Sequence, residues 1–276
     1  MDVDSVSNAG VAFSLLLPTR GRVPLVQRLF DSVVATTTKL RRLEVVLYVD
    51  EDDPESRKIS RHELSIVKIV GRRDETMGNM NRACYEASHG RYVMLINDDA
   101  VFRTTGWDTR VLEAAARFPD GISLIYGNDL DQGEAVPTFP IVSRAACELI
   151  GELCPRGYRN LHIESHLLDI FKRLARLGYY RICYLEDVIF EHMHHVVGKA
   201  VVDSIYTKKN QRADDLLFIA LDDERAFKAR LLVQHIEAAH NHYVMEAGRE
   251  SSGGQTNRFG KKFGLTALLK RMFLSS

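Results

Sequence analysis

The sequence lacks several features that would place it in a class at once. Its 37 basic and 37 acidic residues cancel, so no net charge favours nucleic acid or an anionic membrane as the main partner. No apolar run approaches the roughly 18 residues of a membrane-spanning helix, and the acidic start, MDVDSVSNAG, has no secretory signal pattern. The four cysteines form no CxxC pair, which is typical of reduced thiols. These absences predict a soluble, cytoplasmic protein.

Short apolar segments alternate with helical patterns through the first hundred residues. The composition is ordinary for a globular chain, with 45% hydrophobic and 27% charged residues among 276. Strands that are apolar on both faces are typical of a parallel sheet covered by helices. The sequence therefore predicts an α/β fold with a mostly parallel central sheet flanked by helices. The expected strands are residues 13–17, 44–49, 65–70 and 92–96, and the expected helices are 24–37 and 77–88.

The alternation loosens after residue 101, and the chain ends in helical and basic segments. Helices are expected near residues 107–118, 143–153 and 162–177, a strand near 122–126, and a strand pair within 182–190. We expect a flexible N-terminus over residues 1–11, a main domain over 12–213, a helical extension over 214–250 and a flexible basic tail over 251–276. A length near the limit for one hydrophobic core agrees with one domain that carries appendages.

Two polar clusters follow apolar strands directly. Asn97-Asp98-Asp99 ends the fourth strand, and two adjacent carboxylates there repel each other unless a cation or its ligand offsets them. His192 and His194 alternate along an extended segment and so share a face. A mixed set of carboxylates and imidazoles suits Mn²⁺ or a related divalent ion such as Mg²⁺. The competing interpretations are a capped turn for the acids and a metal-free cluster for the histidines.

The ordered set of motifs resembles a known enzyme family. FSLLLPTRGR at residues 13–22, the acid Asp50, GNMN at residues 78–81 and GRYVMLINDD at residues 90–99 follow one another. Together they are similar to the nucleotide-sugar half of A-type-fold glycosyltransferases of family 2. The resemblance covers about residues 12–208. It implies metal-dependent transfer of a sugar from a nucleoside diphosphate, with UDP expected, to an acceptor hydroxyl with inversion.

The resemblance also implies roles for single residues. It places Asp99 as a metal ligand and His194, or failing it His192, as the second protein ligand of the ion. Asn97 and Asp98 would lie nearer the sugar and ribose, and Asn97 replaces the commoner first Asp of the DxD motif. Lys199 would add a charge at the diphosphate, or else be a solvated surface lysine. The other implied donor-binding residues are Pro18, Thr19, Arg20, Asp50, Arg73, Gly78 and Asn81.

The general base is the least determined of these roles. Family-2 enzymes take it from an acidic pair at the opening of a helix, and this chain has no literal pair there. Glu164 and Asp169 are the candidates, and five residues of helix turn their side chains about 500° apart. We favour Glu164 slightly because it lies at the helix start. Either acid could instead be a carboxylate that the helix dipole favours.

Two other functions and several partners stay open. A sugar-phosphate nucleotidyltransferase would use a similar fold, but it would need a glycine-rich loop that residues 18–22 imitate only weakly. A non-catalytic nucleotide-sugar-binding module is the other alternative. The acceptor could be a glycan, a small molecule or a modified nucleic acid. The tail can be drawn as a basic amphipathic helix that touches a membrane surface or a partner, although a disordered tail is the simpler interpretation.

Overall fold

A computed structural model describes residues 10–193 and 211–252 of the chain. Its centre is an eight-stranded sheet with the order β3-β2-β1-β4-β7-β6-β8-β5. Four of its seven strand pairs are parallel, and the other three are antiparallel. The predicted α/β class with a mostly parallel sheet is confirmed. The strands are β1 (Phe13–Thr19), β2 (Leu43–Asp50), β3 (Ser65–Gly71), β4 (Tyr92–Leu95), β5 (Ala100–Phe102), β6 (Leu124–Asn128), β7 (Ile141–Ser143) and β8 (Ile182–His192).

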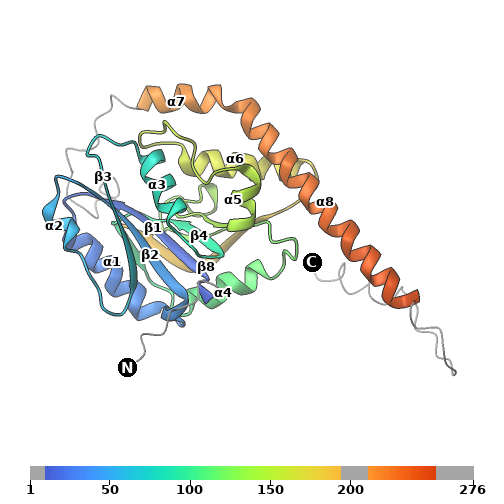
Figure 1. Cartoon of the computed structure of the whole chain (residues 1–276), viewed down its shortest axis with the longest axis horizontal. Coiled ribbons are helices and arrows are strands. Elements are labelled where there is room, and N and C mark those ends of the chain that lie inside the picture. Colours follow the sequence, from blue (N-terminus) through green and yellow to red (C-terminus); the bar gives the residue numbers. More distant parts are fainter. Residues whose placement is uncertain (1–9, 194–210, 253–276) are drawn as a thin grey trace. The chain divides into compact units, whose positions relative to one another are not determined.

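Helices cover both faces of this sheet (Figure 1). One hydrophobic core joins α1 and α4 to the sheet, and a second joins α3, α5, α6 and the first turns of α8 to the other face. Every residue of β1 and β2 is buried, which is why these strands are apolar on both faces. The helices are α1 (Val23–Thr36), α2 (Pro54–Arg57), α3 (Met77–Glu86), α4 (Trp107–Ala115), α5 (Arg144–Ile150), α6 (Ile163–Arg176), α7 (Gln211–Ala220) and α8 (Asp222–Ser252).

The four expected early strands are present as β1 to β4, and the second half of the sheet differs from expectation. The segment 182–190, expected as a strand pair, is part of the single long strand β8. Its first residues pair in parallel with β6, and its last three pair antiparallel with β5. The strands β5 and β7 were not predicted, because three residues are too few for a recognisable alternation. These two short strands bring later parts of the chain to the end of β4.

The C-terminal helices begin within the main compact unit. That unit extends to Ile236, and residues 237–276 form a second unit, of which the helix to Ser252 is described. Ala229, Leu232 and Ile236 are buried in the second hydrophobic core. The first turns of α8 therefore belong to the packed domain. Every helix in the described ranges is too short or too polar to cross a lipid bilayer.

Candidate active site

Asp98 ties together the ends of β1 and β4. Thr19 donates its hydroxyl proton to Asp98 Oδ2 at 2.7 Å, and Arg22 Nη1 donates to Asp98 Oδ1 at 3.1 Å. The carboxylate is buried, and this burial raises the pKa of Asp98 although both partners act to lower it. Two of the expected donor-binding residues, Thr19 and Asp98, thus lie in direct contact.

A second ionic group lies at the end of β2. The guanidinium of Arg20 bonds the buried Asp50 and makes two further hydrogen bonds to Asp52, of 2.6 and 3.0 Å. These two carboxylates raise the pKa of Arg20, so this arginine stays charged at any physiological pH. Arg73 is exposed and lies 3.5 Å from the Asp52 carboxylate. The structure thus gathers three expected residues, Arg20, Asp50 and Arg73, around Asp52.

Helix α3 brings Gly78 and Asn81 to the segment that precedes α6. The amide of Gly78 donates to the Tyr158 carbonyl at 2.9 Å. A Cβ atom at position 78 would come within 2.5 Å of the Pro155 carbonyl oxygen, so only glycine permits this close approach. Asn81 is buried and donates its amide to the Met77 carbonyl at 3.1 Å.

A small cavity connects the end of β4 with α3 and α6. It is lined by three asparagines, a threonine, a glutamate and four apolar side chains. Asn97 belongs to the acidic motif after β4, and Glu164 is one of the two candidate bases, so the structure brings these distant predictions into one cavity. The lining residues are Met77, Asn81, Leu95, Ile96, Asn97, Thr138, Asn160, Ile163 and Glu164.

The two candidate bases have different surroundings. Glu164 lies in the first turn of α6, and burial raises the pKa of its carboxyl, although His192 and His162 act to lower it. Asp169 accepts hydrogen bonds from Arg173 at 2.8 Å and Arg225 at 2.6 Å. Burial alone would raise the pKa of Asp169, but the two arginines lower it. Glu164 thus lines the cavity, while Asp169 joins α6 to α8.

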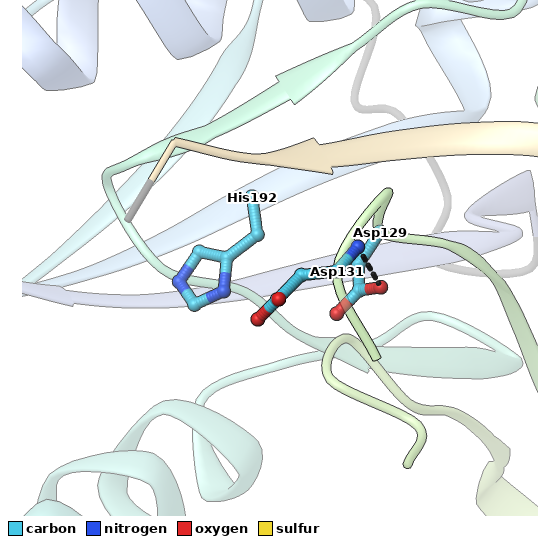
Figure 2. A group of neighbouring side chains, drawn as sticks. All are labelled: Asp129, Asp131 and His192. Carbon is cyan, nitrogen blue, oxygen red and sulfur yellow. Dashed lines mark hydrogen bonds between the residues drawn. The ribbon is translucent and has the colours of Figure 1, made fainter. Parts of the chain in front are cut away.

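The structure groups His192 with two acids that the sequence analysis did not single out. Ligand atoms of Asp129, Asp131 and His192 all lie within 4.8 Å of one another (Figure 2). Asp99, the expected metal ligand, lies beside this group, with its Oδ1 3.4 Å from His192 Nε2. Two carboxylates and one imidazole are a donor set that Mn²⁺ accepts. The structure thus brings Asp99 together with one of the two expected histidines, His192.

Asp129 differs from Asp131 in how much of its carboxylate is already engaged. Its Oδ1 accepts the backbone N–H groups of residues 131, 132 and 133, and its Oδ2 accepts the hydroxyl of Thr138. These bonds lower the pKa of Asp129, against the effect of burial. Asp131 is exposed and directs its carboxylate toward His192 (Figure 2). Asp129 therefore orders the loop, and Asp131 is the acid better placed to hold a cation.

The sequence contains a pattern that could have indicated Asp129 and Asp131. Asn128 ends the mostly apolar strand β6 and Asp129-Leu130-Asp131 follow it directly, much as Asn97-Asp98-Asp99 comes after β4. These acids were not among the predicted ligands, because they lie in a segment with glycine and proline, residues 127–140, for which no helix or strand was expected. His194 and Lys199, the other predicted residues of this side, lie outside the described residues, and so does most of the basic tail.

Comparison with known proteins adds the fold family. No protein-family model and no curated protein matches the sequence. TarS from S. aureus is similar with a TM-score of 0.56 and 14% identity over 82% of this chain, which spans 43% of the TarS chain. A mannosyltransferase from Pyrobaculum calidifontis, solved with GDP-Man and Mn²⁺, has a TM-score of 0.51 and 14% identity. The match covers 88% of this chain and 81% of the mannosyltransferase chain.

A third similar structure is glucosyl-3-phosphoglycerate synthase from Mycobacterium tuberculosis, solved with Mn²⁺, UDP and glucosyl-3-phosphoglycerate. Its TM-score is 0.53 with 16% identity, over 79% of this chain and 81% of its own. A shorter TarS chain, residues 1–349 solved with UDP, has a TM-score of 0.52 and 16% identity, and the match covers 95% of this chain. At such identities the likeness concerns the fold. The described chain has the fold of the A-type glycosyltransferases.

Proposed function

We propose that the protein transfers a sugar from a nucleoside diphosphate to an acceptor hydroxyl, with inversion and with help from a divalent metal. The observation that carries the proposal is the shared cavity of Asn97 and Glu164. It sets a carboxylate of raised pKa beside the acidic motif that follows β4. A base on one side of a donor site is what direct displacement requires.

Glu164 is the proposed general base. Its carboxylate takes the proton of the acceptor hydroxyl while the hydroxyl oxygen attacks the anomeric carbon of the donor sugar. The bond from that carbon to the diphosphate oxygen breaks, and the diphosphate leaves with the electron pair. A raised pKa improves the driving force for this proton transfer. One displacement of this kind inverts the configuration at the anomeric carbon.

Asp99, His192 and Asp131 are the proposed metal-binding residues. The donor set fits Mn²⁺, because ligand atoms of Asp131 and His192 lie within 4.8 Å of each other, Asp99 Oδ1 lies 3.4 Å from His192 Nε2, and Asp131 is exposed. When bound, the ion would neutralise the negative charge of the leaving diphosphate. Asp98 acts differently, because it is held between Thr19 and Arg22. Its role is to fix the loops that border the donor.

The expected donor carries UDP. Of the similar proteins, one TarS structure and the synthase contain UDP, whereas the mannosyltransferase contains GDP-Man. Arg20, Asp50 and Asp52 form an ionic group at the ends of β1 and β2. We propose that the nucleoside is bound at this group.

A donor panel tests the proposal directly. Release of nucleotide is measured for UDP-, GDP- and dTDP-sugars with Mn²⁺ and with a chelator, and the anomeric configuration of each product is read by NMR. We expect UDP-sugars with Mn²⁺ to give the fastest release, and inverted products. Retained configuration would overturn the base mechanism. Nucleotide binding without release from any donor would favour a binding module instead.

A further inference from the structure

The carboxylate of Asp214 links the C-terminal helices to the segment that leads into the cavity. Asp214 lies in the first turn of α7 and is 1% exposed. It accepts three backbone hydrogen bonds, from the N–H groups of Arg159 at 2.8 Å, Asn160 at 2.9 Å and Leu161 at 2.8 Å. Hydrogen bonds to an ionised acceptor are among the strong ones. One side chain thus determines the course of three consecutive residues more than fifty positions away.

Those three residues lead directly into the base. Asn160 lines the cavity, and Ile163 and Glu164 line it just beyond. His162, between them, has a positive φ of 69°, a conformation that non-glycine residues adopt only when their surroundings impose it. The position of Glu164 therefore depends on how the segment 159–161 is held.

The same segment is held from the other side by α3. The amides of Met77 and Gly78 donate to the carbonyls of Arg159 at 3.2 Å and Tyr158 at 2.9 Å. Asp215 adds a contact of 2.7 Å to the ring of His162. The segment is therefore clamped between the donor side of the domain and α7.

We propose that Asp214 is a positioning residue for the base Glu164, so that α7 contributes to the geometry of the active site. This inference rests on the proposed function, because it takes Glu164 as the base. Asp214 is buried and is not among the residues that line the cavity. It acts by fixing the segment that sets the first turn of α6, and a displacement of about 1 Å at a reacting group costs on the order of 100-fold in rate.

A matched control is available in α8. Lys228 is also buried, and its ammonium pairs with Glu152 and with Glu224 at 2.5 Å. It joins the C-terminal helices to the domain without touching residues 159–161. Lys228→Met should therefore lower stability as Asp214→Asn does, while the base stays in place.

The experiment compares the full chain with Asp214→Asn, Asp214→Glu and Lys228→Met. Asp214→Glu keeps the negative charge, so it can still be measured if Asp214→Asn does not fold. Its longer side chain displaces the segment 159–161, which Asp214 binds. We expect both Asp214 variants to lose about 10- to 100-fold in kcat with little change in the KM of the donor. Lys228→Met should have a lower Tm than the native chain, with less than about a threefold change in kcat. Equal kcat losses at equal Tm losses in all three variants would overturn the proposal.

A second measurement does not need turnover. NMR titration of ¹³C-labelled glutamate, assigned through Glu164→Gln, reads the pKa of Glu164, which burial in the domain raises. We expect this pKa to move toward the ordinary value in both Asp214 variants and to stay in place in Lys228→Met. An unchanged pKa in the Asp214 variants would refute positioning. If no donor reacts while the pKa still moves, the proposed function fails and the positioning role stands.

Discussion

The two halves of the domain stabilise four buried carboxylates around the site in different ways. In the first half, Asp50 pairs with Arg20, and Asp98 pairs with Arg22 and Thr19. In the second half, Asp129 and Asp214 each accept three backbone N–H groups. Side-chain partners can exchange when a charged ligand arrives, whereas backbone partners fix the course of a loop.

This difference suggests that the two halves have different roles at the site. Arg20 and Arg22 are about a third and a fifth exposed, so a diphosphate that enters the site can compete with the acids for their guanidinium groups. The second half instead presents Glu164, just after the bonded segment 159–161, and Asp131, within the loop that Asp129 holds. We infer that the first half adapts to the donor and the second half presents rigid groups to it.

The largest expected effect tests whether the second half carries the chemistry. Glu164→Gln should lower transfer by about 10²- to 10⁴-fold, because the base is lost, while calorimetry should show unchanged UDP binding. In the native protein, activity should fall as the pH drops through the Glu164 pKa, which lies above the ordinary value because of burial. Asp169→Asn should mainly lower stability, and a greater loss of transfer in this variant than in Glu164→Gln would reverse the assignment.

A second test separates the two acids near His192. Asp131→Asn should weaken Mn²⁺ binding in the presence of UDP by at least about tenfold, because Asp131 supplies a ligand. Asp129→Asn should instead lower Tm, since a carboxamide cannot accept all of the hydrogen bonds that Asp129 accepts. Mn²⁺ affinity can be followed by electron paramagnetic resonance. If Asp131→Asn binds Mn²⁺ as tightly as the native chain, Asp131 is not a ligand.

A third test breaks the contact between the two halves. Gly78→Ala should lower the free energy of unfolding by about 1–3 kcal/mol, because the added methyl group meets the Pro155 carbonyl. Asn79→Ala, the next position in α3, serves as a control and should cost less. Urea denaturation gives both values. Equal stability of Gly78→Ala and the native chain would mean that the close approach is easily relaxed.

The smallest effect concerns His166, which is buried in α6. Burial and the nearby charges of Lys228 and Arg225 lower the pKa of His166 to about 3. The unfolded chain takes up a proton near pH 6.5 and the folded chain does not, so stability is lost as the pH falls below 6.5. The expected loss is about 1.4 kcal/mol per pH unit. His166→Gln should lose less stability between pH 6.5 and 5 than the native chain does, and an identical slope in urea denaturation would contradict this.

Several features followed from the sequence alone. Polar clusters directly after apolar runs predicted that Asp50, Asp98 and Asp99 would lie at strand ends, and the structure has them there. Strand and helix alternation predicted the parallel half of the sheet. These inferences succeed because each depends on neighbouring residues, and because parallel strands bring their carboxyl ends to one edge.

Other features depended on contacts between distant residues. Helix periodicity showed that Glu164 and Asp169 diverge, but it could not show that Arg225, 56 residues after Asp169, bonds Asp169 while Glu164 lines the cavity. The short strands β5 and β7, which no local pattern indicated, carry the chain to the end of β4. There Asp131 meets His192, and α7 brings Asp214 to the segment before the base. The sequence specified the chemical groups of the site, and the tertiary structure selected among them, because burial and partners are decided only when the chain packs.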